Sequence, residues 1–389
     1  MSARRALGAI ALSLLVPASL VLVTANGSAT ETSGELVTQT VHLVALPPIV
    51  QPGGGVASPD DAKAALTATI QPIAVGRKVR LQVRRGSSWQ TVATVSQAMS
   101  GRAEFAARAS MNGRALTYRV KAVSYRGLPS VKSSTVSTQR WLTPTWTDGF
   151  SGDSLSKEWN YRGQTYEPQS LRRCSRGSAK AVGVGGGALR LSVIRDPSRF
   201  ATCPALRRGQ IAGRYAYRLN GHIGTDKAIS FKYGVAAARI KFPPARGQHG
   251  SFWMQPVGGM YPGSTGHEID VTEFFGAISH RSGLFSYIHR YEGGRIVKTG
   301  AKIPDTFLHG PRDGWAKNFH VFSVQWKPRS LVFRIDGKET WRIGGAISRV
   351  RQYLILSLLA SDYELPLMQD RQLPQHMYVD WVRVWETGG

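Results

Sequence analysis

The segment HEIDVTEFFG, residues 267–276, places three carboxylates among apolar residues and decides how this part of the chain folds. The apolar residues predict a β-strand that packs on a core. Side chains of a strand alternate between its faces, so Glu268 and Asp270 share one face while Glu273 points to the other. One extra residue between Asp270 and Glu273, a β-bulge, would rotate Glu273 back onto that face. We expect this bulge, because otherwise a charged group points into apolar packing.

The sequence around this strand alternates with period two from Trp146 to Trp385 and shows almost no helical pattern. Runs such as ALRLSVI, HVFSVQW and YVDWVRVW are separated by Gly- and Pro-rich joints, which predicts a large two-sheet sandwich. Shorter alternating runs before it predict a small immunoglobulin- or fibronectin-like β-sandwich. The predicted fold class is all-β, with domains at residues 36–140 and 144–389.

The N-terminus is typical of a secretion signal over residues 1–25. Arg4 and Arg5 precede a long apolar run, and small residues follow it up to Ala25. An uncleaved membrane anchor is the alternative, because the run approaches spanning length. We therefore expect a secreted, extracellular protein with no membrane contact after signal cleavage.

The chain contains two cysteines, Cys174 and Cys203. In an oxidising compartment, such a pair predicts one disulfide that closes a loop-rich region. Two buried free thiols are the alternative.

The 389 residues carry a formal net charge of +26. The arginines are spread through strand-like segments instead of one run or helix, which argues against a nucleic-acid partner. The charge favours attraction to an anionic surface such as a cell wall or an acidic polysaccharide. Biased codon usage explains the same excess of arginine without any function.

Three acids on one face repel one another, and glycoside hydrolysis needs such an arrangement. One ionised carboxylate attacks the anomeric carbon and one protonated acid donates to the leaving oxygen. Repulsion within the trio raises at least one pKa and so supports opposite protonation states. Ca²⁺ binding by the trio and a solvated acidic edge strand are alternatives. The edge strand is disfavoured by four residues that we expect to face the core, Ile269, Val271, Phe274 and Phe275.

EIDVTE resembles the Glu-x-Asp-x-x-Glu signature of glycoside hydrolase family 16, in the bulged form of its laminarinase-type members. DGFSGDSLSKEW, YGVAAARIKFP, GQHGSFW and YVDWVRVW are similar to further strands and loops of that family. The resemblance covers about residues 146 to 386. It implies a β-jelly-roll whose concave sheet carries a substrate cleft.

By position, the resemblance implies that Glu268 is the nucleophile and Glu273 the general acid/base. It implies that Asp270 hydrogen-bonds the nucleophile and helps to set protonation states. Trp253 is expected to stack on a sugar ring, with burial in the core as the alternative. His289 is expected to hydrogen-bond substrate or the acid/base, with a structural role as the alternative.

The sequence also departs from the family pattern. His249 and Gly250 stand where the first Trp and the Pro of a laminarinase-type loop are expected, so His249 is a candidate substrate contact. The Arg-rich segment 172–208 has no assigned counterpart and is a candidate cleft wall for an anionic sugar chain. No cofactor or catalytic metal is required, although a structural Ca²⁺ is compatible with the resemblance, with Asp380 among its candidate ligands.

The predicted function is that of a secreted, retaining endo-glycoside hydrolase whose partner is a polysaccharide substrate, in the first place a β-1,3- or mixed-linkage glucan. Hydrolysis of an anionic galactan-type polysaccharide and transglycosylation remain open as alternatives. A non-catalytic carbohydrate-binding protein is the alternative from another class.

Overall fold

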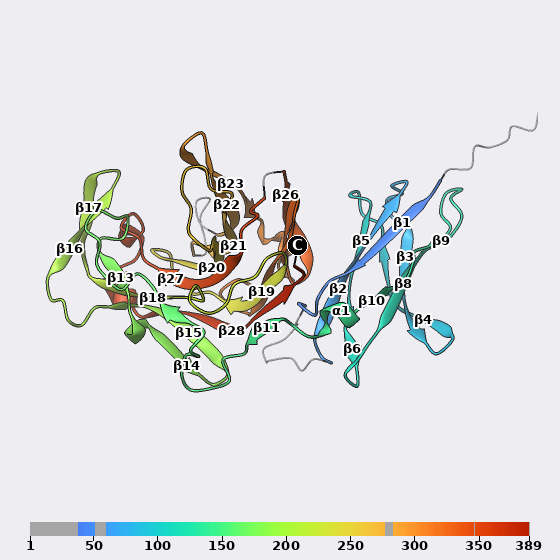
Figure 1. Ribbon diagram of the computed structural model, residues 1–389, viewed down its shortest axis with the longest axis horizontal. Coiled ribbons are helices and arrows are strands. Elements are labelled where there is room, and N and C mark those ends of the chain that lie inside the picture. The colour runs from blue at the N-terminus through green and yellow to red at the C-terminus, as the bar shows by residue number, and fades with distance from the viewer. Residues whose placement is uncertain (1–37, 51–59, 277–282, 346, 389) are drawn as a thin grey trace, which may run out of the picture. The chain divides into compact units, whose positions relative to one another are not determined.

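The computed structural model describes residues 38–50, 60–276, 283–345 and 347–388, and nearly all of their regular structure is β-strand (Figure 1). The predicted signal segment lies outside the described residues. The one α-helix of the described part, α1 (Gln139–Leu142), is a single turn. No helix there has the length and apolar character needed to cross a bilayer.

Two small sheets form the region that precedes α1. The first has the order β1 (Thr40–Ala45), β2 (Lys63–Gln71), β5 (Arg102–Arg108). The second has the order β10 (Val136–Ser137), β8 (Thr117–Ala122), β3 (Lys78–Arg85), β4 (Ser88–Ser96), with β9 (Val131–Lys132) paired to β8 and a separate pair β6 (Ser110–Met111) and β7 (Arg114–Ala115). Buried residues of both sheets form one core that includes Leu66, Ile70, Val79, Leu81 and Val120.

The remainder of the chain forms one long curled sheet. Its strands in spatial order are β23 (Arg295–Ile303), β22 (Leu284–Glu292), β21 (Glu268–Phe274), β20 (His249–Pro256), β27 (Gln352–Leu359), β18 (Arg218–Gly224), β15 (Ala188–Arg195), β28 (Gln375–Glu386), β19 (Gly234–Lys241), β24 (His320–Lys327), β25 (Ser330–Ile335) and β26 (Lys338–Gly344). Four short strands pair at its margins, namely β11 (Trp146–Asp148), β12 (Asn160–Tyr161), β13 (Ser175–Gly177) and β14 (Val182–Gly185).

Strand β18 joins the two halves of this sheet. Its residues 218–220 pair with β15, whereas residues 221–224 pair with β27. The halves therefore fold over one shared core, which takes its side chains from strands of both, including Leu191, Phe252, Met254, Leu356 and Val379. Because the ladder is continuous through β18, the predicted two-sheet sandwich takes the form of one curled sheet.

Alternation along the strands determines which residues face the site. On β20, Phe252 and Met254 belong to the core, so Trp253 and Gln255 point to the opposite, concave face. The neighbouring strand β27 is registered so that Ile355 lies opposite Trp253. The concave face of β22, β21, β20 and β27 is therefore the surface on which the polar residues of the central strands gather.

The predicted disulfide is confirmed, since Cys174 and Cys203 are bonded. It ties the hairpin of β16 (Thr202–Arg207) and β17 (Gln210–Ala216) to the segment that enters β13. The Asp362 carboxylate accepts the backbone N–H groups of Cys174 and Leu206, both at 3.1 Å. The Arg-rich segment is thereby fixed to the loop that follows β27.

Candidate active site

The three carboxylates lie on β21 with a bulge between the second and the third. Asp270 pairs with Tyr287 of β22, and Glu273 pairs with Phe285, so three steps on one strand match two on the other. The expected bulge is therefore present. It brings Glu273 to the face that carries Glu268 and Asp270, because side chains that pair directly across a ladder lie on one face.

The apolar residues of β21 pack on the other face, with one exception to the prediction. Ile269, Val271 and Phe274 are buried in the core as expected. Phe275, in contrast, is only half-buried, and its ring stacks on His249 at 5.0 Å between centroids. The prediction that Phe275 faces the core was wrong, because it lies beyond the end of the strand, where the alternation no longer holds.

A hydrogen bond from β20 orients the Glu268 carboxylate. Gln255 Nε2 donates to Glu268 Oε2 at 2.9 Å. The Gln255 carbonyl oxygen in turn accepts from the Tyr353 hydroxyl at 2.8 Å and from Arg162 at 3.3 Å. Since two donors bind the amide oxygen of Gln255, its N–H₂ group is directed at the Glu268 carboxylate. Gln255 contacts Oε2 of Glu268 and leaves Oε1 without a hydrogen bond from this amide.

Asp270 lies between the two glutamates and is 3% exposed. Burial raises its pKa well above the ordinary value, and the charges of Glu273 and Glu268 add to the shift. His289 Nε2 lies 3.2 Å from Asp270 Oδ2 and 3.9 Å from Glu268 Oε1. Burial acts to lower the pKa of His289, but the hydrogen bond with Asp270 outweighs it and the pKa is raised. Both pKa shifts favour the protonated forms of these two groups.

Glu273 borders a cation and an aromatic ring. Lys298 Nζ of β23 lies 4.0 Å from Glu273 Oε2 and 3.5 Å from the centroid of the Tyr287 ring. Burial, with the charges of Glu273 and Asp270, raises the pKa of Tyr287 to about 12, so the phenol stays neutral. Glu273 thus has a positive group on one side and an un-ionised hydroxyl nearby.

Trp253 is half-buried on the same face, opposite Asp270 in the register of β20 and β21. Its indole N–H donates to Ser357 at 3.1 Å, and its ring stacks on His222 with 6.1 Å between centroids. Burial, followed by the charges of nearby arginines, lowers the pKa of His222 to about 3, so this ring is neutral. The role of Trp253 as a platform for a sugar remains a prediction.

His249 is 4% exposed, and its Nδ1 lies 2.7 Å from the Glu364 carboxylate. Its burial beneath Phe275 argues against the predicted direct contact with substrate.

His289, as described above, faces Asp270 and Glu268 instead of Glu273. The sequence alone did not predict that His249 contacts Glu364 or that His289 contacts Asp270.

The residues proposed for metal binding have other partners or unsuitable atoms. Asp380 forms a buried ion pair with Arg239, which occupies its carboxylate. Ligand atoms of Glu268, Asp270 and His289 lie within 4.8 Å of one another. Ca²⁺ takes oxygen ligands, so the imidazole of this cluster does not suit Ca²⁺, and Ca²⁺ binding by Glu268, Asp270 and Glu273 stays an alternative.

Sequence reasoning missed several residues of the site. Gln255 could have been predicted, because it lies two residues after Trp253 on one strand and so shares its face. Arg162, Tyr353 and His222 come from separate strands or their ends, and only the folded sheet brings them to the carboxylates.

The comparison with protein families adds to this geometry. The profile of Glycosyl hydrolases family 16 matches residues 206–353, a range that includes all three carboxylates. Residues 206–353 are therefore similar to glycosyl hydrolase family 16. The register of β21 and β22 within that range gives the sheet its acidic concave face.

Among curated proteins, Glucan endo-1,3-beta-glucosidase A1 of Niallia circulans is 27% identical over 269 residues, which are 62% of this chain and 37% of that protein. Gram-negative bacteria-binding protein 3 of Drosophila melanogaster is 28% identical over 136 residues, which are 31% of this chain and 25% of that protein. The chain thus spans well under half the length of these relatives.

Among solved structures, the laminarinase catalytic domain from Thermotoga maritima MSB8 matches with a TM-score of 0.50 and 19% identity, over 64% of this chain and 99% of that chain. At this identity the likeness concerns the fold alone. It confirms the predicted fold class, an all-β domain of jelly-roll type.

Proposed function

We propose that this chain is a secreted, retaining endo-glycoside hydrolase that cleaves a β-1,3- or mixed-linkage glucan. The observation that carries the proposal is the bulge of β21, which sets Glu268 and Glu273 on one face around the buried Asp270. Two carboxyl groups on one surface are what double displacement requires. The name of the Niallia circulans relative, a glucan endo-1,3-beta-glucosidase, supports the choice of glucan.

In the first step, a Glu268 carboxylate oxygen forms a bond to the anomeric carbon while the glycosidic C–O bond breaks. Glu273, in its protonated form, transfers its proton to the departing oxygen. Gln255 holds one oxygen of Glu268 through its 2.9 Å hydrogen bond, which leaves the other oxygen for the attack.

In the second step, Glu273 is a carboxylate and takes a proton from water as the water oxygen attacks the anomeric carbon. The ester bond to Glu268 breaks, and both glutamates return to their starting states. Asp270 and His289 lie beside the nucleophile, so their protonation sets the charge around Glu268 as it is consumed and regenerated.

A second candidate function is glucan binding without hydrolysis. It is favoured by relatives whose names describe binding, the Drosophila protein and the Beta-1,3-glucan-binding protein of Hyphantria cunea, 26% identical over 127 residues. Binding alone does not require a buried carboxyl group between two glutamates, which favours the hydrolase. Hydrolysis of an anionic galactan and transglycosylation use the same two glutamates, and a product analysis distinguishes them.

The test is turnover of β-1,3-glucan by the mature protein and by Glu268→Gln and Glu273→Gln. We expect the first variant to lose about 10⁴-fold or more in kcat/KM and the second about 10²- to 10⁴-fold. Glu292→Gln is the matched control, since Glu292 is an exposed carboxylate at the end of the adjacent strand. Wild-type turnover in either active-site variant would refute the mechanism.

Azide separates the two roles. In Glu273→Ala, azide is expected to restore cleavage of an activated aryl glycoside and to yield the β-glycosyl azide, because the covalent intermediate still forms. In Glu268→Ala it replaces the nucleophile and yields the α-azide. The reverse pairing of anomers would exchange the two assignments. Binding of glucan without any products from the wild type would favour the second candidate function.

A further inference from the structure

A cavity of about 780 Å³ is lined by the half of the curled sheet that does not carry the carboxylates and by Val50, Lys63 and Ala106 of the preceding region. Its walls include Lys241 at the end of β19, His320 at the start of β24 and Lys338 at the start of β26. These strands are at the opposite end of the sheet order from β21. The cavity is therefore distinct from the proposed active site.

Cations dominate the lining of this cavity. Five of its residues are lysine or arginine, and two are aspartate, so the formal charge is five minus two, or +3, with neutral histidines. The cations are Lys63, Lys241, Arg312, Lys317 and Lys338. Within the described part of the chain, none of the five forms an ion pair with a carboxylate. Lys317 Nζ also donates to the Pro311 carbonyl oxygen at 3.0 Å, which leaves its positive charge unneutralised.

The two aspartates are held by groups of the protein. His320 lies between them, with Nδ1 2.8 Å from Asp336 and Nε2 3.1 Å from Asp313. Asp313 also accepts the backbone N–H of His309 and the side-chain amide of Asn318, both at 2.8 Å. Burial acts to raise the pKa of Asp313, but these hydrogen bonds lower it to about 2. The acids are thus engaged internally and do not neutralise the lysines.

An aromatic ring lies among the cations. Phe319 is half-buried in the wall, with Lys241 Nζ 5.5 Å and the Arg239 guanidinium 4.7 Å from its centroid. An apolar ring beside cations suits a ligand that has both apolar faces and negative charge. Sugar rings with anionic substituents have both.

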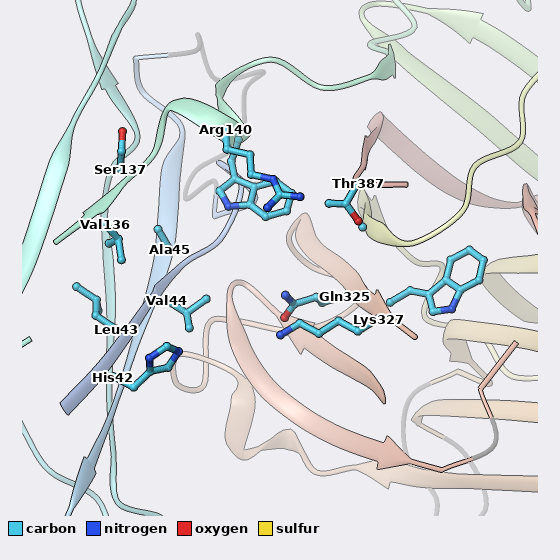
Figure 2. Close-up of a pocket in the computed structure, with 13 residues that line it drawn as sticks. His42, Leu43, Val44, Ala45, Val136, Ser137, Arg140, Gln325, Lys327 and Thr387 are labelled. Atoms are coloured by element: carbon cyan, nitrogen blue, oxygen red, sulfur yellow. The ribbon is translucent and has the colours of Figure 1, made fainter. Parts of the chain in front are cut away.

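We propose that this cavity binds a segment of an anionic polysaccharide chain, through Lys241, Arg312 and Lys317. Its volume falls in the range of roughly 300 to 1,000 Å³ that is usual for organic ligands and exceeds the needs of one small anion. This site would hold the protein on a charged matrix and stands apart from the proposed hydrolysis. Another hollow, of about 460 Å³, is lined partly by Leu43, Val44 and Ala45 and favours no one ligand chemistry (Figure 2).

The probe is dextran sulfate, with carboxymethyl dextran as a second anionic chain and plain dextran as the neutral counterpart. An α-linked glucan is not a substrate for the proposed β-glucanase, so binding is measured without cleavage. The variant combines Lys241→Gln, Arg312→Gln and Lys317→Gln. We expect its affinity for the anionic chains to fall about tenfold or more, because three charge-assisted contacts are lost, while neutral dextran binds neither protein.

The matched control combines Arg80→Gln, Lys121→Gln and Lys132→Gln. These cations are neighbours across β3, β8 and β9 on an open sheet face, and their removal lowers the net charge by the same amount. We expect the control to bind the anionic chains nearly as the wild type does. Thermal melting and turnover of neutral β-glucan establish that both triple variants are folded.

Three results would overturn the proposal. Equal loss of affinity in both triple variants would mean that net charge alone attracts the polymer. Unchanged affinity in the cavity variant would remove the cavity from the binding. Inorganic sulfate that binds as tightly as the polymer would show a site for a single ion. Loss of affinity in only one anionic series identifies whether sulfate or carboxylate is the group bound, and supports the proposal.

Discussion

Replacing Asp270 with asparagine is expected to stabilise the protein as the pH rises, although it lowers turnover. The pKa of Asp270 in the folded protein is raised above its ordinary value of 3.8, first by burial and then by Glu273 and Glu268. A carboxyl group with a raised pKa in the folded state contributes stability below about pH 4, and that contribution is lost as the pH rises through the folded pKa. Asparagine stays neutral and avoids the loss.

The raised pKa of His289 acts in the same direction. Its contribution to stability is present below its ordinary value of 6.5 and is lost as the pH rises through the raised folded value. In the variant the charged partner of His289 is absent, so this contribution to acid stability disappears. Both effects make the difference between variant and wild type grow in favour of the variant from pH 4 to pH 8.

The geometry sets the size of the effect. Carboxylate oxygens of Glu268 and Asp270 lie within 4.8 Å of each other, and two full charges at that distance repel by about 3.5 kcal/mol at an effective dielectric constant of about 20. Protonation of either carboxyl group removes this repulsion, so the value applies at a pH at which both are ionised. At about 2 to 4 °C per kcal/mol for a domain of this size, the variant gains up to about 7 to 14 °C in Tm relative to wild type at alkaline pH.

The assay is thermal unfolding of the wild type, Asp270→Asn and the exposed control Asp153→Asn at several values between pH 4 and pH 8.5. Turnover is measured on the same samples, and we expect kcat of Asp270→Asn to fall about 10- to 100-fold, since a group beside the nucleophile is altered. A difference in Tm that is the same at every pH, or that favours the wild type more as pH rises, would refute the electrostatic argument.

Two further substitutions test the contacts that hold the site and its border. Gln255→Leu removes the hydrogen bond to Glu268, and such a bond to a charged acceptor is worth about 1.5 to 3 kcal/mol. Steady-state kinetics should therefore show a kcat about 10- to 100-fold lower with little change in KM. An unchanged kcat would mean that Glu268 does not need this hydrogen bond. Cys203→Ser removes the disulfide to Cys174 and should lower the free energy of unfolding by about 3 to 4 kcal/mol, the loop-closure value. We expect a lower Tm, and the same decrease when the wild type is treated with a reductant. A wild-type Tm that a reductant leaves unchanged would contradict this.

Periodicity predicted the features that depend on a few neighbouring residues. The alternation of β21 predicted a buried apolar face, and the cost of burying a charge predicted the bulge that the register shows. The same local rule failed at Phe275, where the strand has ended and the ring packs on His249 instead of the core. A period-two argument is valid only while the ladder continues.

Features that depend on the joining of distant segments were not predictable. Arg162 and Tyr353 meet at Gln255 although nearly two hundred residues separate them. Burial of His249 depends on Glu364, which follows another strand. Asp380 was a candidate metal ligand until the structure showed its partner, Arg239. In each case, one polar group has several potential partners in the sequence, and only the fold selects among them.

The net charge of +26 and the acidic strand need not point to one ligand. The carboxylates lie on β21, near one end of the sheet order, whereas four cations of the large cavity lie on β19 and β26 or in the loop before β24, near the other end, and the fifth, Lys63, lies on β2. Binding of an anionic chain at the cavity and hydrolysis at Glu268 would therefore use different sets of residues. The basic composition is therefore consistent with a neutral glucan as substrate. The cations of the cavity would bind the anionic chain, while the carboxylates of β21 would act on the glucan.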